Sequence, residues 1–229
     1  MAHDTDPWLT EPHHLFASAP VLLLTLATGA VDAISFLALG GVFTSVMTAN
    51  LALLGLSVGS WELPLAGHSL LAIAGYVCGV LLGSRITVRR TGPRWTGARC
   101  ALLVETVVLC GATVAWALWG GAPHSGGRLA LLAVMSVAMG AQGGAVRAAG
   151  APGLSTTYLT GALTGALTSL MTTGRLQWDN AVLVFVLMAG AALGGLMLTQ
   201  AQPAAVGLPA ALVAAALVLS FVVSPPRRT

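Results

Sequence analysis

Three ionisable residues lie within long apolar stretches of this chain: Asp32, Glu105 and Arg147. A charged side chain at the centre of a bilayer costs on the order of 3 kcal/mol or more, so such residues face a partner or a wet cavity. Asp32 lies roughly 18 Å along a helix that starts at Pro20, which is near mid-membrane. Asp32 and Arg147 are therefore predicted to bind a solute or a proton together, to lock two helices as an ion pair, or, if Arg147 reaches an interface, to stay apart.

Glu105 lies closer to a charged loop. It stands about 9 Å from Arg99 along a helix, which places its carboxyl group near the membrane surface. The long side chains of Arg99 and Arg85 can reach back to such a position. We therefore expect Glu105 to pair with one of these arginines, or, if its helix faces a cavity, to act as a proton relay.

Neutral polar side chains cluster around two glycine-rich breaks, at 40–41 and 150–153. A helix break inside a membrane leaves backbone N–H and C=O groups without hydrogen-bond partners, and hydroxyl and amide side chains can supply those partners. The same groups, with the partial positive charge of half-helix N-termini, are suited to a small polar or anionic solute. Both roles stay open for this cluster, whose members are Thr44, Ser45, Thr48, Asn50, Gln142, Ser155, Thr156, Thr157, Tyr158 and Thr160.

The two breaks belong to two near-copies of one pattern, about 110 residues apart. Residues 28–32 and 47–51 form the first copy, and residues 139–143 and 159–163 form the second. Weak internal repeats around Gly/Pro-broken hydrophobic segments are typical of transporter-like membrane proteins, and the breaks mark where a site would lie.

The composition defines the class of protein. Hydrophobic residues make up 56% of the chain and charged residues 7%, against roughly 25% charged in an ordinary soluble domain. The prediction is an all-α polytopic protein in a lipid bilayer. The net charge of +3 gives no reason to expect a nucleic-acid partner. Cys78, Cys100 and Cys110 show no metal or redox spacing and read as small hydrophobes, so neither a metal nor a cofactor is expected.

The apolar stretches 20–58 and 129–172 are each too long for one straight crossing. Each is either two short crossings, for eight in total, or one crossing plus a half-helix, for six. Five arginines between 85 and 99 mark a cytoplasmic loop, and only six crossings bring the arginines after 170 to the same side. Six is therefore favoured, with both termini cytoplasmic. The apolar segments are 20–39, 43–58, 65–84, 100–119, 129–146, 154–172, 180–199 and 206–223.

Six crossings make each half an odd, three-helix unit, so the two repeats are inverted relative to each other. The predicted organisation is a polar cytoplasmic tail at 1–19, one membrane domain at 20–223 and a basic cytoplasmic tail at 224–229. Repeat one covers 20–119 and repeat two covers 129–223, each with a broken first helix.

Small residues four apart let membrane helices approach closely. This spacing predicts a seam between the two halves at Gly75, Gly79 and Gly83 and at the matching Gly190 and Gly194. Tryptophans at span ends are typical of an aromatic belt at the membrane surface; they are Trp61, Trp116, Trp119 and Trp178.

The break regions also carry a family resemblance. Residues 29–36 with 47–51, and Gly140, Gln142 and Arg147 with 156–161, resemble the motifs of the YoaK family of bacterial membrane proteins, a family of unknown function. The resemblance covers roughly 20–225. Members commonly have Asn after the Gln, where this chain has Gly143, and Thr-Gly-Asn where it has Ala49-Asn50. The resemblance implies six spans and a location in the bacterial cytoplasmic membrane, and it implies no activity.

The function that these features favour is a small-solute transporter or channel-like protein, coupled to protons through Asp32. The alternative is a non-transporting membrane module that acts as partner or regulator of another complex. No catalytic motif supports an enzyme. A homo-oligomer is among the assemblies that the composition allows. The candidate site residues are Asp32, Thr48, Asn50, Glu105, Gln142, Arg147, Tyr158 and Thr160.

Overall fold

The computed structural model describes residues 19–89, 94–148, 159–174 and 176–222, which form helices and no strands. The elements, in chain order, are α1 (Ala19–Ala38), α2 (Met47–Ser60), α3 (Leu63–Arg89), α4 (Arg94–Leu118), α5 (Ser125–Ala148), α6 (Leu159–Thr173), α7 (Trp178–Gln200), the short 3-10 helix η5 (Gln202–Ala204) and α8 (Gly207–Val222).

Six of these helices are long and apolar enough to cross a membrane, as predicted: α1, α3, α4, α5, α7 and α8, the last together with η5. The other two, α2 and α6, have 14 and 15 residues. At 1.5 Å per residue they reach about 21–23 Å, short of the ~30 Å hydrocarbon core. Among the described residues, six helices therefore have the length and composition of a crossing, in agreement with the six-crossing prediction.

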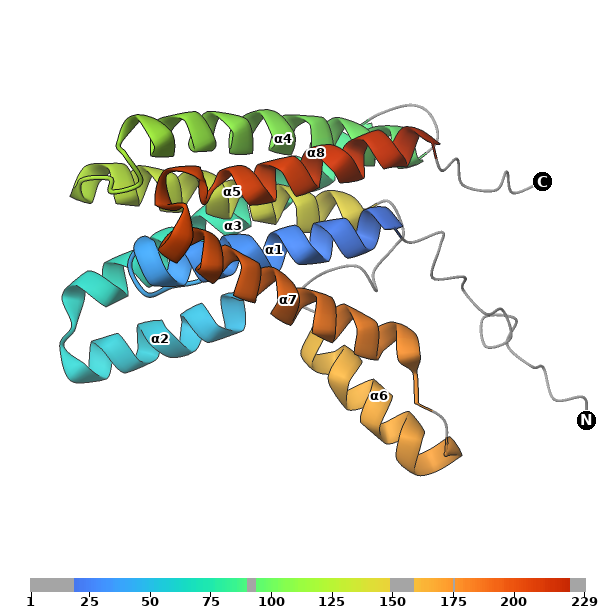
Figure 1. The fold of residues 1–229 in the computed structure, drawn as a ribbon. Helices are drawn as coiled ribbons and strands as arrows, with labels where there is room; N and C mark the ends of the chain where they lie inside the picture. The colour runs from blue at the N-terminus through green and yellow to red at the C-terminus, as the bar shows by residue number, and fades with distance from the viewer. Residues whose placement is uncertain (1–18, 90–93, 149–158, 175, 223–229) are drawn as a thin grey trace, which may run out of the picture.

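The first break folds the chain back along α1. Gly40 and Gly41 have φ angles of 126° and 75°, which side-chain-bearing residues rarely adopt. A Cβ atom on Gly40 would also meet the imidazole ring of His68. After this turn the chain returns to the level of Asp32, and α2 starts there and runs outward again (Figure 1). The first break thus produces a half-helix that begins inside the bundle.

Two glycine seams hold the bundle together, because α3 packs along α5 and α7 packs along α1. A Cβ on Gly79 or Gly83 would collide with the backbone of α5, and one on Gly190 or Gly194 with the backbone of α1. Helix α3 belongs to the first half of the chain and α5 to the second. The predicted seam between the halves is therefore present.

The contacts of the two seams are the same under one shift in residue number. Gly29 abuts the carbonyl of Leu187, and Gly140 abuts the carbonyl of Tyr76. Gly29 and Gly140 are 111 residues apart, and so are Tyr76 and Leu187. In Figure 1, α1 and α5 run in opposite directions. Equal spacing and opposite direction are both features that an inverted repeat requires.

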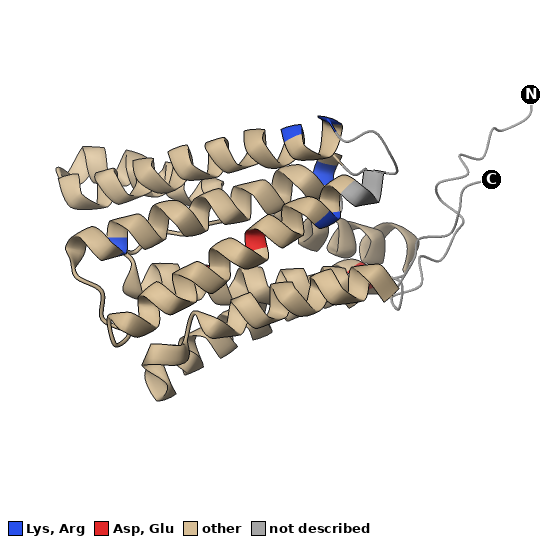
Figure 2. Cartoon of the chain, turned by 90° about the horizontal axis from the view of Figure 1, so that it is seen from above, with Lys and Arg blue, Asp and Glu red and all other residues tan. Residues whose placement is uncertain are grey.

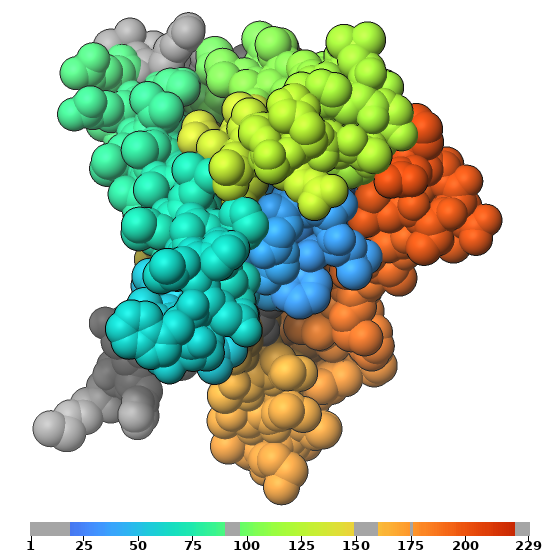
Figure 3. All heavy atoms as spheres, turned by 90° about the vertical axis from the view of Figure 1, so that its left-hand side faces the viewer, coloured from blue at the N-terminus to red at the C-terminus, as the bar shows by residue number. Residues whose placement is uncertain are grey.

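Helices α1 and α5 are the central helices, since each has more than half of its spanning window buried. Figure 3 shows the end of α1 enclosed by neighbouring helices, while α6 protrudes from the body. Basic residues gather at one end of the bundle (Figure 2). Helix α1 begins at this end and α8 finishes there (Figure 1).

The prediction that Trp116 belongs to an aromatic belt at the membrane surface is wrong. Trp116 has 0% of its surface exposed, and its indole Nε1 donates a 2.6 Å hydrogen bond to the carbonyl oxygen of Gln202. This contact ties α4 to η5. Trp61 and Trp178 are exposed, at 84% and 67%.

Candidate functional site

Asp32 anchors the returning chain at the first break. Its Oδ1 accepts hydrogen bonds from the backbone N–H and the hydroxyl of Thr44, at 2.8 and 2.9 Å, and from the backbone N–H of Ser45, at 2.9 Å. Its Oδ2 accepts the Ser45 hydroxyl at 2.5 Å. Asp32 is 6% exposed. Four donors from two residues therefore satisfy this carboxyl group inside the bundle.

The position of Asp32 also explains how an acidic residue is tolerated there with no cation beside it in the described part of the chain. Its donors lie just before Met47, where α2 begins, and a helix N-terminus carries a partial positive charge. The adjoining cavity of about 260 Å³ has mostly apolar walls, among them Phe36, Phe43 and Leu187. Asp32 thus has the surroundings of a structural anchor, and the predicted pair with Arg147 does not form.

Asn50 is a second anchor of the same loop. Its amide Nδ2 donates to the Phe43 carbonyl at 2.6 Å, and its Oδ1 accepts the Phe43 backbone N–H at 2.9 Å. Asn50 is buried, whereas the neighbouring candidate Thr48 is exposed on α2. Asn50 therefore satisfies backbone groups of this loop, which is the structural role expected of the cluster. The hydroxyls of Thr44 and Ser45 instead donate to the Asp32 carboxyl group.

Glu105 lies in a buried polar row that crosses the centre of the bundle. Its Oε1 accepts a 3.0 Å hydrogen bond from the Gln142 amide, and the Gln142 Oε1 accepts a 3.4 Å hydrogen bond from the Thr28 hydroxyl. Glu105 is 1% exposed. Its Oε2 is buried with no hydrogen-bond partner among the residues that the structure places. The row joins α4, α5 and α1.

The expected pairing of Glu105 with Arg99 or Arg85 is wrong. The Arg99 guanidinium instead donates to the carbonyl oxygen of Ser220 and lies 4.8 Å from the ring centre of Phe221. Arg99 thereby joins α4 to the end of α8. Helical rise alone could not show this, because it gives the height of Glu105 and not the direction in which its side chain points.

Replacing Glu105 by Gln is expected to cost only about 1 kcal/mol of stability, since the new amide nitrogen takes the buried place of Oε2, which has no partner among the described residues. A carboxamide keeps the volume and can accept the same hydrogen bond from Gln142. Glu105→Ala is expected to cost about 2–3 kcal/mol, because it opens a void and leaves the Gln142 amide unpaired. Thermal unfolding in detergent measures both, with the exposed Glu62→Gln as control. A large loss for Glu105→Gln would show that the buried group must carry charge.

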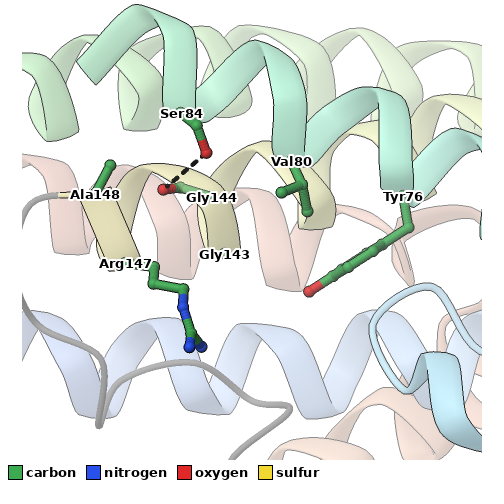
Figure 4. A pocket seen from close by; sticks show the side chains of 7 residues that line it. All are labelled: Tyr76, Val80, Ser84, Gly143, Gly144, Arg147 and Ala148. Carbon is green, nitrogen blue, oxygen red and sulfur yellow. Dashed lines mark hydrogen bonds between the residues drawn. The ribbon is translucent and has the colours of Figure 1, made fainter. Parts of the chain in front are cut away.

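Arg147 lines a groove of about 340 Å³ between α3 and α5. The other polar groups of its wall are the Tyr76 and Ser84 hydroxyls, and the Ser84 hydroxyl donates a 3.4 Å bond to the Gly144 carbonyl. In Figure 4 the guanidinium and the Tyr76 side chain extend to the same side of the helix pair. Arg147 and Ala148 lie in the last turn of α5, so this end of the groove is near the end of that helix.

Thr160 does not take part in these arrangements. Thr160 is exposed on α6, and its carbonyl oxygen accepts the hydroxyl of Thr164 at 2.9 Å. Tyr158 and the second break lie outside the described residues. Sequence reasoning missed Thr28, Tyr76 and Ser84. The spacing of Thr28 and Asp32, four residues apart on one helix, is the signal that points to Thr28.

These observations define a multi-pass α-helical membrane protein whose buried polar groups lie at and near a broken first helix. The chain belongs to the family described as "Protein of unknown function (DUF1275)", whose model matches residues 21–219. It is 35% identical over 142 residues to the UPF0700 transmembrane protein YoaK of Bacillus subtilis (strain 168), a match over 62% of this chain and 61% of that protein. No solved structure matches.

Proposed function

We propose that this protein carries a small polar or anionic solute across the membrane, with a proton as coupling ion. The observation that supports it best is the fold-back between α1 and α2, which starts a half-helix beside the buried carboxyl group of Asp32. Discontinuous helices of this kind form the solute sites of many secondary transporters. The groove beside Arg147 supports an anionic solute, because a guanidinium is permanently charged.

Glu105 is the group that we propose carries the proton, in place of Asp32. All four donors around Asp32 point at its oxygens, so a proton on Asp32 would displace one of them. Glu105 receives one hydrogen bond, at Oε1, and its Oε2 is buried without a partner in the described part of the chain. A proton on Oε2 makes this carboxyl group neutral, which an apolar interior favours.

Flux measurements in proteoliposomes test the proposal. Vesicles that enclose a pH-sensitive dye are given gradients of small carboxylates, inorganic phosphate, amino acids and sugars in turn. At least one class is expected to enter faster than into protein-free vesicles, saturably and with a change of internal pH. Glu105→Gln should still bind the solute but lose the response to a pH gradient. Folded protein that moves none of these solutes would contradict the proposal.

The saturated environment of Asp32 favours one other function, a non-transporting module that assists another membrane complex. A carboxyl group with four internal donors and apolar cavity walls suits a scaffold as well as a transporter. In that case neutralising Asp32 or Arg147 lowers stability at most, and no solute in the vesicle assay shows a flux.

A further inference from the structure

The groove beside Arg147 and the cavity beside Asp32 occupy equivalent places in the two halves of the chain. A shift of 111 residues carries Asp32 to Gly143 and Phe36 to Arg147, and each of these residues lines its own cavity. The same shift relates further wall residues of the two cavities: Leu187 and Tyr76, Ala191 and Val80, Ala33 and Gly144, and Leu37 and Ala148.

The two cavities differ in the charged group that lines them, an acid in the first and a cation in the second. In the first, the chain supplies a carboxyl group, Asp32, and closes it with its own donors. In the second, Gly143 stands at the position of Asp32 and supplies no side chain, while Arg147 stands where the first cavity has Phe36. The second cavity therefore has a cation where the first has an aromatic ring, and no acid where the first has one.

Arg147 has no carboxylate within ion-pair distance among the residues that the structure describes. An arginine within a membrane span is costly unless it meets an anion or water. The guanidinium is planar, and its two parallel N–H groups match the two oxygens of a carboxylate. The hydroxyl group of Ser84 lies in the same wall. These groups fit the carboxylate of a small solute.

We propose that the groove binds the carboxylate of a small solute, with Arg147 as its main ligand. The carboxylate takes the place that Asp32 takes in the other half. The inference rests on the proposed function, since it names the class of solute. The volume of about 340 Å³ is at the small end of ligand pockets, so a solute of few heavy atoms is expected.

Binding of propionate to the full chain in phosphatidylcholine nanodiscs tests this. Sodium propionate is expected to raise the melting temperature saturably, while propionamide and sodium chloride at equal ionic strength do not. Arg147→Gln should weaken propionate binding about tenfold or more, the usual effect of losing a charged hydrogen-bond pair. Arg147→Lys should retain part of the affinity. Arg89→Gln, an exposed arginine in the last turn of α3, should bind as wild type does.

Gly143 offers a second and sharper test. Gly143→Asp places a carboxylate of the chain at the position equivalent to Asp32, and should abolish propionate binding. Gly143→Asn has the same size and no charge, and should keep most of the binding. In both variants the new Cβ meets the Tyr76 hydroxyl at 3.1 Å, so any steric effect is shared. Equal loss in the two variants would overturn the charge argument.

Three other results would also overturn the inference. Propionate could raise the melting temperature of Arg147→Gln as much as that of wild type, or propionamide could raise it as much as propionate does. In the third, methyl phosphate or anionic lipid stabilises the protein and propionate does not. The last would make Arg147 a ligand of phosphate groups. The vesicle assay separates this inference from the proposed function. If propionate binds but no flux is seen, the proposed binding site stands and the proposed transport function is contradicted. If another solute shows a flux that Arg147→Gln does not change, the transport function stands and the proposed site is contradicted.

Discussion

Replacing Gly79 by leucine is expected to destabilise the protein by at least about 3 kcal/mol, the upper range for overpacking a core. A Cβ at Gly79 would collide with the backbone carbonyl of Val137 on α5. Backbone atoms of a packed helix cannot turn aside as the end of a flexible side chain can. The whole of α3 must therefore move away from α5, and the contacts along that seam weaken together.

Gly67→Leu is the matched control, because Gly67 lies on the same helix with no atom within 4 Å of an added Cβ. It removes the same glycine and adds the same side chain, but towards open space. Thermal unfolding and the yield of monodisperse protein in detergent measure both variants. We expect Gly67→Leu to match wild type or exceed it, since leucine favours a helix more than glycine does. Equal losses in the two variants would show that the seam is not close-packed.

Replacing Asp32 by alanine is expected to cost about 3–5 kcal/mol, as when one partner of a buried charged contact is removed. The backbone N–H groups and hydroxyls of Thr44 and Ser45 then lose their acceptor inside the bundle. Asp32→Asn keeps a carbonyl oxygen in place of Oδ1 for the three donors that bind there. The Ser45 hydroxyl can rotate to accept a hydrogen bond from the new amide nitrogen. We therefore expect a cost of about 1–2 kcal/mol for Asp32→Asn.

Hydrogen exchange at residues 39–46 locates the effect of these two variants. Protection of the Thr44 and Ser45 amides should fall in Asp32→Ala and persist in part in Asp32→Asn. Asp179→Ala provides the control, because Asp179 is exposed in the first turn of α7. Full protection in Asp32→Ala would mean that other contacts hold the loop, and Asp32 would then be free for a role in binding.

The class of fold and the first break follow from sequence because they depend on local chemistry. Apolar runs of about 20 residues predict spans, and Gly40-Gly41 predicts the interruption wherever the chain goes next. The partner of Asp32 could not be read in the same way. Thr44 and Ser45 reach it only because the loop folds back along α1, and that path depends on two consecutive left-handed glycine conformations.

The environment of Glu105 shows a second limit of sequence reasoning. Its height in the membrane follows from helical rise, but its partner depends on how α4 is rotated about its axis. Apolar residues surround most of α4 in sequence and give little amphipathic signal for that rotation. The structure turns Glu105 towards Gln142 on α5. Rotation of an apolar helix is therefore the information that composition and spacing leave undetermined here.

The exchange of helices between the two seams has a consequence for how the chain assembles. Helix α1 packs along α7 and α5 along α3, so each central helix finds its close glycine contact in the opposite half. During synthesis, α1 enters the membrane well before its partner α7 exists. Either half alone could form neither seam, because each seam joins a helix of the first half to a helix of the second. The covalent link between the halves thus keeps each central helix close to the partner that its seam requires.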